Sequence, residues 1–409
     1  MSNGLGWLRS DGPLKRLNHT DTHNESILFY LYLKIYKMRV SDVMAILDQW
    51  APLAYSEDFD NTGLLVGDAS AEVRGIIVTL DTLEEVVDEA IAQKCNLIVS
   101  FHPIIFSGLK KITPQDYTTR SVRKAIKNDI AIFAIHTALD NAIFGVSATM
   151  AQALGLRNSR ILMPKENVLT KLVTYIPQDS VAEVRDALFA AGGGAIGHYD
   201  HCNFEVLGTG RFRPTDQAKP AIGHIGQNHS GPEVQMSITF MAHLKTPVMD
   251  ALKLAHPYEE VAYDLTNLPQ TCSEIGMGMV GDLAQPMTPN AFMDLVKNAF
   301  NCGVIKYSKE YQNQIQRVAV LGGSGSFAID RAKASKADCY LTADLKYHDF
   351  FKGEKDFLLA DIGHYESEQH TKALIVNYLS KKITNFAPSL PPCKVVLSKV
   401  NTNPISYYS

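Results

Sequence analysis

The sequence lacks the short motifs that mark several common classes of hydrolase and metal site. It contains no GxSxG nucleophile elbow, no HExxH zinc helix and no CxxC pair. Its six cysteines are scattered along the chain, which argues against a disulfide framework and against a thiolate zinc site. Reduced, mostly buried thiols are typical of cytosolic proteins, and we therefore predict a cytoplasmic location.

The sequence also lacks a strong excess of charge and a long apolar run. A formal net charge of −4 at pH 7 argues against nucleic acid or an anionic membrane as a partner. The apolar run at 27–36 is far too short to span a bilayer. It also makes a poor signal-peptide core, because Glu25 precedes it and no small-residue cleavage site follows. We predict that residues 1–37 are an N-terminal extension and that the folded protein begins near Met38.

The length and the strand and helix patterns indicate more than one unit. A chain of 409 residues is too long for one compact core. Strands alternate with helices in 38–166 and again in 276–409, which predicts two mostly parallel α/β lobes. Between them, 167–275 reads as two successive β-α-β units, which predicts a small ferredoxin-like α+β insert. The predicted fold class is therefore α/β, with two similar lobes forming one domain that the insert interrupts.

The two α/β regions also share a pattern with each other. Segment 76–102 aligns with 318–344 without a gap, and 130–140 aligns with 358–368. The alignment pairs polar side chains at the strand ends: His102 with Asp344, His136 with His364, and Asp140 with Glu368. Ligands of parallel α/β sheets collect outside the carboxyl ends of the strands, so these side chains are predicted to share one site. The alternative is that some of them, such as Asp140 and Asp344, are ordinary helix caps.

The strongest single signal lies at 357–382. The pattern predicts a buried strand, a turn at Gly363 and then one long helix. His364 and Glu368 lie four residues apart at the start of that helix, so their side chains share a face. An imidazole and a carboxylate at this spacing form half of a divalent-metal site. The alternative is a solvated first turn in which Glu368 interacts with the helix dipole.

Two further motifs are weaker. The loop GGSGS at 322–326 follows a predicted strand and is either a phosphate cradle or a tight structural turn. It lacks the lysine of a Walker A motif. The segment HPYEE at 256–260 is a candidate second site within the insert, although most of the insert's histidines are expected at the surface.

Four separated stretches carry a resemblance to a known family: SEDFDNTGLLVGD, SFHPIIF, AIHTALDNA and DIGHYESE. Through them, about 38–400 of the chain resembles the NGG-one-interacting-factor-three-like proteins, also called GTP cyclohydrolase type-2-like or dinuclear-metal proteins. The stretches GAIGHYDHCNF, GTGRFRP and HPYEEVAYDL resemble the PII/CutA-like domain of the longer bacterial members.

The resemblance implies a two-metal centre. Carried over position by position, the metal ligands become His102, Asp140, His364 and Glu368. The family has a pair of histidines where this chain has Phe101 and His102, so one metal is expected to have one protein ligand fewer.

The resemblance also implies roles beyond the ligands. His136 is expected to support a ligand or to act in acid–base chemistry with Glu368, and Asp344 and His348 are expected in the pocket. It further implies a homohexameric ring whose PII-like inserts cap a central cavity.

Two functional hypotheses follow from these residues. Mixed imidazole and carboxylate ligands suit Zn, Mn, Fe, Co or Ni. Two such ions about 3.5–4 Å apart would bridge a hydroxide, lower its pKa and clamp both oxygens of a displacement. The first hypothesis is a hydrolase of a nucleotide or another phosphorylated or ring-amide substrate. The second is a non-catalytic metal-binding or regulatory ring whose PII-like insert senses a small ligand or a partner.

Overall fold

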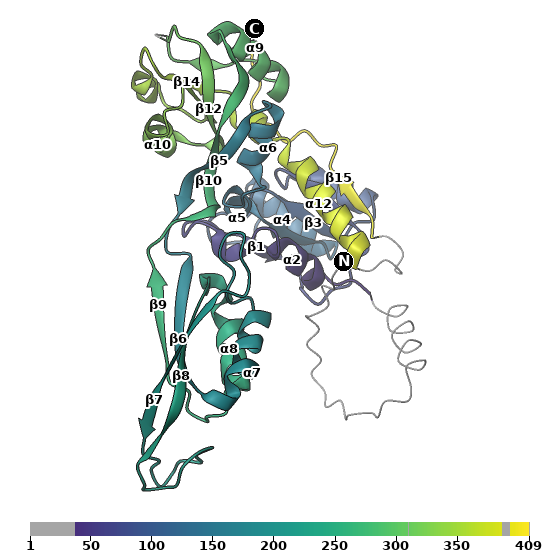
Figure 1. Cartoon of the computed structure of the whole chain (residues 1–409). Coiled ribbons are helices and arrows are strands. Elements are labelled where there is room, and N and C mark those ends of the chain that lie inside the picture. The colour runs from purple at the N-terminus through teal and green to yellow at the C-terminus, as the bar shows by residue number, and fades with distance from the viewer. Residues whose placement is uncertain (1–36, 310, 387–392, 409) are drawn as a thin grey trace.

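The computed structural model describes residues 37–309, 311–386 and 393–408. Figure 1 shows two α/β lobes together and a third unit, the insert, that extends away from them. Of the predicted extension 1–37, only Lys37 falls within this range, and its ammonium lies 2.8 Å from the carboxylate of Glu72. Within the described ranges, no helix has both the length and the apolar composition needed to cross a bilayer.

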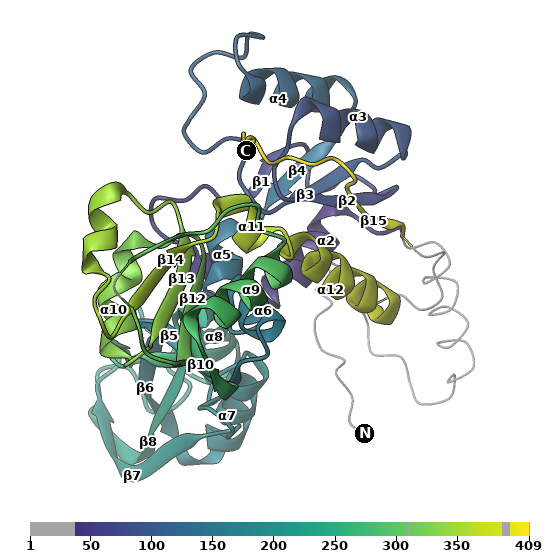
Figure 2. The ribbon, with the colours of Figure 1, turned by 90° about the horizontal axis from the view of Figure 1, so that it is seen from above.

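Lobe 1 is built on a five-stranded sheet with the order β1-β4-β3-β2-β15. Its strands are β1 (Gly63–Val66), β2 (Ile76–Thr79), β3 (Leu97–Ser100), β4 (Ala131–Ala134) and β15 (Val395–Leu397). The parallel strands β2, β3 and β4 are buried along their whole length, because helices cover both of their faces. Figure 2 shows α3 (Glu84–Ala92) and α4 (Tyr117–Lys127) on one face of this sheet, with α2 (Val40–Asp48) and α12 (Thr371–Phe386) on the other.

Lobe 2 repeats this plan in a six-stranded sheet with the order β11-β14-β13-β12-β10-β5. Its strands are β5 (Arg157–Lys165), β10 (Cys272–Met287), β11 (Lys306–Tyr307), β12 (Ile315–Ser324), β13 (Cys339–Ala343) and β14 (Leu358–Asp361). Helices α6 (Val146–Ala153) and α9 (Pro289–Phe300) pack on one face, and α10 (Ile329–Ala334) packs on the other.

The predicted internal repeat is confirmed by the two sheets. The unit β2-α3-β3 of lobe 1 corresponds to β12-α10-β13 of lobe 2, and both strand pairs are parallel. Strand β4 leads into α5 (His136–Asp140), just as β14 leads into α11 (His364–Glu368). In each lobe a short strand, β1 or β11, pairs antiparallel with that last parallel strand. The aligned polar residues therefore follow equivalent strand ends.

The lobes exchange segments in a way that the order of the sequence does not reveal. Strand β5 precedes the insert, yet it pairs with β10 at the edge of the lobe 2 sheet. Conversely, β15 comes near the end of the chain and pairs in parallel with β2 of lobe 1. Helix α12 likewise packs its apolar face into the core of lobe 1. The boundaries predicted for the separate domains remain a prediction, but these exchanges tie the two lobes together.

The insert has the predicted ferredoxin-like arrangement. Its elements are β6 (Leu169–Pro177), α7 (Val181–Ala190), β7 (Asn203–Phe212), β8 (His229–Met241), α8 (Lys245–Ala255) and β9 (Tyr263–Leu268). The strands pair antiparallel in the order β7-β8-β6-β9, and both helices pack on one face of the sheet. Buried positions alternate with less buried ones along β6, because only one face of this antiparallel sheet is covered by helices.

The prediction of one long helix after Gly363 was wrong. Helix α11 ends at Glu368, and α12 begins at Thr371. The two intervening side chains bond to the end of α9: Gln369 donates to the carbonyl of Phe300 at 2.7 Å, and His370 Nε2 lies 3.1 Å from the carbonyl of Ala299. These tertiary contacts separate the two helices, and a pattern of apolar residues along the chain does not report them.

Candidate metal centre

The candidate site lies where the carboxyl ends of the parallel strands of both lobes meet. His102 comes two residues after β3 of lobe 1, and His364 is the first residue of α11 in lobe 2. Their imidazole rings lie 5.4 Å apart between centroids. Residues from two lobes, far apart in the sequence, thus converge on one place, as the strand-end rule for α/β sheets predicts.

Three side-chain atoms form the centre of the site. Oε2 of Glu368 lies 3.1 Å from Nε2 of His102 and 3.2 Å from Nε2 of His364. All three atoms lie within 4.8 Å of one another, as the ligands of a single ion do. The Glu368 side chain is only 4% exposed, whereas the two imidazoles are partly exposed. Two imidazoles and one carboxylate are a ligand set that suits a divalent transition metal.

A carboxylate contacts Nδ1 of each imidazole and fixes the orientation of the ring. Nδ1 of His102 lies 2.8 Å from Oδ1 of Asp81, and Nδ1 of His364 lies 2.7 Å from Oδ2 of Asp344. When Nδ1–H donates to the carboxylate, the Nε2 lone pair faces the centre of the site. This carboxylate–histidine arrangement is the usual support of metal-binding histidines.

The buried carboxylate of Glu368 provides a test of whether a cation fits. Its Oε2 has no hydrogen-bond partner among the described residues, although both imidazole Nε2 atoms lie within ion-pair distance of it. A buried, charged oxygen without a partner is costly. Burial opposes ionisation of Glu368, but the two imidazoles outweigh it and lower the pKa of the carboxyl to about 2. The oxygen is therefore an anionic acceptor, and a divalent cation would satisfy it.

The carboxylates around His102 and His364 favour positive charge between these two imidazoles and Glu368. Burial lowers the pKa of His102, but Asp81 and Glu368 outweigh it and raise the pKa to about 10. In the same way, Asp344 and Glu368 outweigh burial at His364 and raise its pKa to about 11. Either protons or a metal ion can supply this charge. The donor set therefore fits a divalent cation.

The glycines of the GGSGS loop make room for Glu368. Gly323 adopts a φ of +69°, and a Cβ at this position would collide with Oε1 of Glu368. Its N–H donates to the hydroxyl of Ser367 at 2.9 Å. Gly322 and Gly323 are thus part of the end of β12 and pack against α11. This arrangement favours the tight structural turn over the phosphate cradle.

His136 and Asp140 lie beside the three-atom group. The His136 ring is 5.2 Å from that of His102, and its Nδ1 lies 2.8 Å from Oδ1 of Asp60. Asp60 also accepts a hydrogen bond from the backbone N–H of Thr137 at 3.1 Å.

Burial, and then the charge of Glu368, raises the pKa of Asp140 well above its usual range. Asp140 lines the adjoining cavity but does not belong to the three-atom group.

Two predicted positions remain, Phe101 and His348, and neither contributes an atom to the three-atom group. Phe101 is fully buried in the core of lobe 1, and its ring packs edge-to-face against His136 with centroids 5.5 Å apart. His348 lies in a short 3-10 helix, and its ring contacts Tyr347 and Phe351. Asp60 and Asp81 were not predicted as site residues, although Asp60 lies within the stretch SEDFDNTGLLVGD that resembles the family. The only available signal for Asp81 was its place directly after a buried strand.

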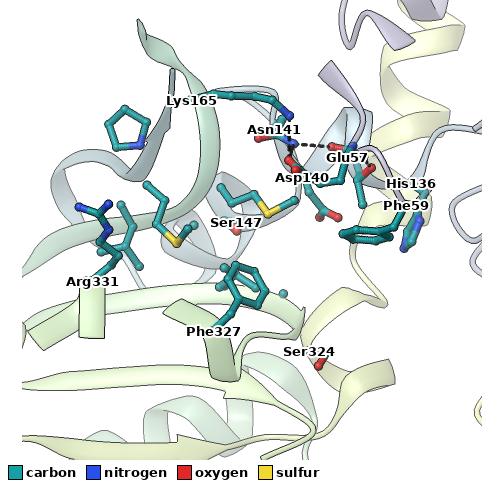
Figure 3. Close-up of a pocket in the computed structure, with 18 of the residues that line it drawn as sticks. Glu57, Phe59, His136, Asp140, Asn141, Ser147, Lys165, Ser324, Phe327 and Arg331 are labelled. Carbon is teal, nitrogen blue, oxygen red and sulfur yellow. Dashed lines mark hydrogen bonds and ion pairs between the residues drawn. The ribbon is translucent and has the colours of Figure 1, made fainter. Parts of the chain in front are cut away.

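A cavity of about 720 Å³ opens from the site between the two lobes (Figure 3). His136, Asp140, His364 and Glu368 line one part of it. In Figure 3, Arg331 lies on the opposite side of the cavity from His136, and Phe327 lies between them. The cavity has two cationic side chains in its lining, Lys165 and Arg331. The ammonium of Lys165 lies 2.8 Å from the carboxylate of Glu57.

Arg331 has no charged partner within the described ranges, so its guanidinium is available to an anion.

The fold and the site define a class of protein. It has two exchanged α/β lobes, a candidate transition-metal site between them and a ferredoxin-like insert. The model of the Duf34/NIF3 (NGG1p interacting factor 3) family matches residues 38–404. The chain therefore belongs to the Duf34/NIF3 family.

Known relatives share both the sequence and the fold. The chain is 35% identical over 367 residues to a Bacillus subtilis protein named GTP cyclohydrolase 1 type 2 homolog, covering 89% of this chain and 97% of that one. A Staphylococcus aureus protein of the same name is 34% identical over 374 residues, covering 90% of this chain and all of that one. The crystal structure of a Bacillus cereus protein related to NIF3 is similar with a TM-score of 0.79 and 34% identity, covering 91% of this chain and all of that one.

Proposed function

We propose that this protein is a metal-dependent hydrolase that acts on a nucleotide or another phosphorylated substrate. The observation that carries the proposal is the convergence of His102, His364 and Glu368 at the edge of a cavity of about 720 Å³. The cavity is large enough for a small organic substrate. The name shared by the relatives, GTP cyclohydrolase 1 type 2 homolog, agrees with a nucleotide substrate.

Different residues of the site would have different roles in such a reaction. A bound divalent ion, whether Zn, Mn, Fe, Co or Ni, would lower the pKa of a coordinated water and polarise the substrate. His102, His364 and Glu368 would hold that ion, with Asp140 beside them as the proposed ligand of a second. Asp60 holds the Nδ1 side of His136, so its other ring nitrogen is available for proton transfer in the cavity.

The polarity of the cavity supports a particular orientation of the substrate. Arg331 lies opposite His136, away from the three-atom group (Figure 3). A guanidinium without an internal partner is well suited to phosphate. We propose that a substrate phosphate lies at Arg331 and that a ring or amide carbon lies at the metal. This orientation favours hydrolysis of a ring amide over hydrolysis of a phosphoester.

Chelation and one conservative variant test this proposal. The purified, metal-loaded protein should hydrolyse a member of a panel of purine and pteridine nucleotides, and a chelator should abolish the turnover. Glu368→Gln keeps the shape of the side chain but removes its charge, and it should abolish both metal binding and turnover. A metal-loaded protein that is inert across nucleotide, cyclic-amide and phosphoester panels would contradict the proposal.

A second candidate is a non-catalytic, metal-binding regulatory ring. A separate cavity of about 530 Å³ in the insert favours it, with Arg211, Phe212, Glu233 and Tyr258 among its lining residues. We propose a homohexamer as the assembly and the cytoplasm as its location. Removing 168–268 from the chain separates the candidates: a regulatory insert leaves metal content and turnover intact, whereas an insert needed for assembly dissociates the oligomer.

A further inference from the structure

The C-terminal tail, residues 398–408, crosses from lobe 1 to lobe 2 beside the candidate metal site. It follows β15, which is an edge strand of the lobe 1 sheet. A Cβ added to Gly303, just after α9, would meet the Tyr407 ring at 3.6 Å, so the end of the tail packs on lobe 2. The tail therefore spans the two lobes that together supply the site.

The tail contacts the support of one metal ligand. The hydroxyl of Thr402 donates to Oδ2 of Asp81 at 2.6 Å, while Oδ1 of the same carboxylate lies 2.8 Å from Nδ1 of His102. Thr402 is only 4% exposed. Both oxygens of Asp81 are thus engaged, one by the tail and one by the imidazole. A carboxylate held at both oxygens cannot rotate without breaking one of these partly buried hydrogen bonds.

A second contact reaches the helix that carries the other ligands. The amide of Asn403 donates to Oε1 of Glu366 at 3.1 Å, and Glu366 lies in α11 between His364 and Glu368. Adjacent residues of the tail thus bind the lobe 1 support and the lobe 2 ligand helix. The equivalent carboxylate behind His364, Asp344, has no such contact with the tail among the described residues.

From this geometry we propose that the C-terminal tail is part of the metal site and that Thr402 is a positioning residue for His102. Thr402 holds Asp81, Asp81 holds the ring of His102, and Nε2 of that ring faces the site. The tail touches neither the substrate cavity nor the three-atom group itself. It acts on metal affinity and metal geometry through Asp81.

The experiment uses the full chain and Co²⁺ as the probe. Thr402→Val removes the hydroxyl with little change in shape, and it should weaken Co²⁺ binding about 10-fold, the lower end of the effect of removing outer-shell support. The visible absorption spectrum of the bound Co²⁺ should change as well, because His102 is less well fixed. Thr402→Ser keeps the hydroxyl and should retain both the affinity and the spectrum of the wild type.

A matched control in the same tail separates positioning from general stability. The hydroxyl of Ser398 donates to Glu89 at 2.6 Å, away from Asp81, and Ser398 is as buried as Thr402. Ser398→Ala should lower the thermal midpoint without changing Co²⁺ affinity or the spectrum. Equal affinity and spectrum in Thr402→Val and wild type would overturn the proposal, as would an equal loss in Ser398→Ala. A wild-type chain that binds no Co²⁺ would instead overturn the metal site together with this role of Thr402.

Discussion

Oε2 of Glu368 lies 3.1 Å from Nε2 of His102, although the first residue belongs to lobe 2 and the second to lobe 1. This contact makes the candidate metal site an interface between the lobes. A cation bound there would connect them, so metal binding and the stability of the folded chain should be linked.

The first prediction follows from this linkage. A divalent transition metal at about 100 times its dissociation constant should stabilise the fold by about 2.7 kcal/mol. Glu368→Gln should abolish this gain in a thermal unfolding measurement with and without metal. Glu354→Gln changes the same charge at an exposed ion pair with Lys333 and should leave the gain intact. Equal gains in both variants would contradict the assignment of Glu368 as a ligand.

The second prediction concerns the close approach of Gly323 to Glu368. Gly323→Ala places a Cβ against Oε1 of Glu368, at a backbone φ of +69° that residues other than glycine rarely adopt. It should destabilise the chain by about 1–3 kcal/mol and displace Glu368, so that metal affinity falls as well. Gly108→Ala is the control, because a Cβ at Gly108 has no atom within 4 Å. Denaturant unfolding and metal titration of both variants measure the effect. Retained metal affinity in Gly323→Ala would show that the contact does not position Glu368.

The third prediction concerns the position where the family resemblance implies a histidine. Phe101→His should raise the metal content per chain above that of the wild type, because it supplies the ligand that phenylalanine cannot. The fully buried Phe101 ring also contributes to the core, so the variant should lose about 1–3 kcal/mol of stability. Elemental analysis after metal loading and dialysis measures the content. An unchanged content would show that the site binds the same number of ions with either residue.

The fourth prediction is a pH dependence that arises at Asp60. Burial alone would raise its pKa, but the bonds from His136 and Thr137 outweigh burial and lower the pKa to about 2. A carboxyl with a lowered pKa in the folded state stabilises the fold above its unfolded pKa of about 4, and that stability is lost as the pH falls towards about 2. The Asp60 side chain is fully buried, so the contribution is about 2 kcal/mol.

Asp60→Asn removes this titration. In urea unfolding between pH 5 and pH 3, the wild type should lose more stability than Asp60→Asn as the pH falls. Comparing the two slopes cancels the other carboxyl groups, which titrate in both proteins. Parallel slopes would mean that Asp60 has an ordinary pKa in the folded chain.

Several features were predictable because they depend on local patterns. The buried parallel strands read as short apolar runs, and their repetition revealed the two lobes. His364 and Glu368 were found as a pair because a helix places residues four apart on one face. The break after Glu368 was not predictable, since it depends on bonds from Gln369 and His370 to the end of α9.

By itself, the sequence determined the succession of strands and helices, the repeat and the residue types able to bind a metal at strand ends. The tertiary structure decided that β5 and β15 change lobes, that Asp81 and Asp344 orient the two imidazoles, and that Thr402 reaches Asp81. The physical reason is the distance along the chain over which each kind of interaction acts. Periodicity and turn chemistry act over a few neighbouring residues, whereas the direction of a ligand's lone pair is set by groups that arrive from distant parts of the chain.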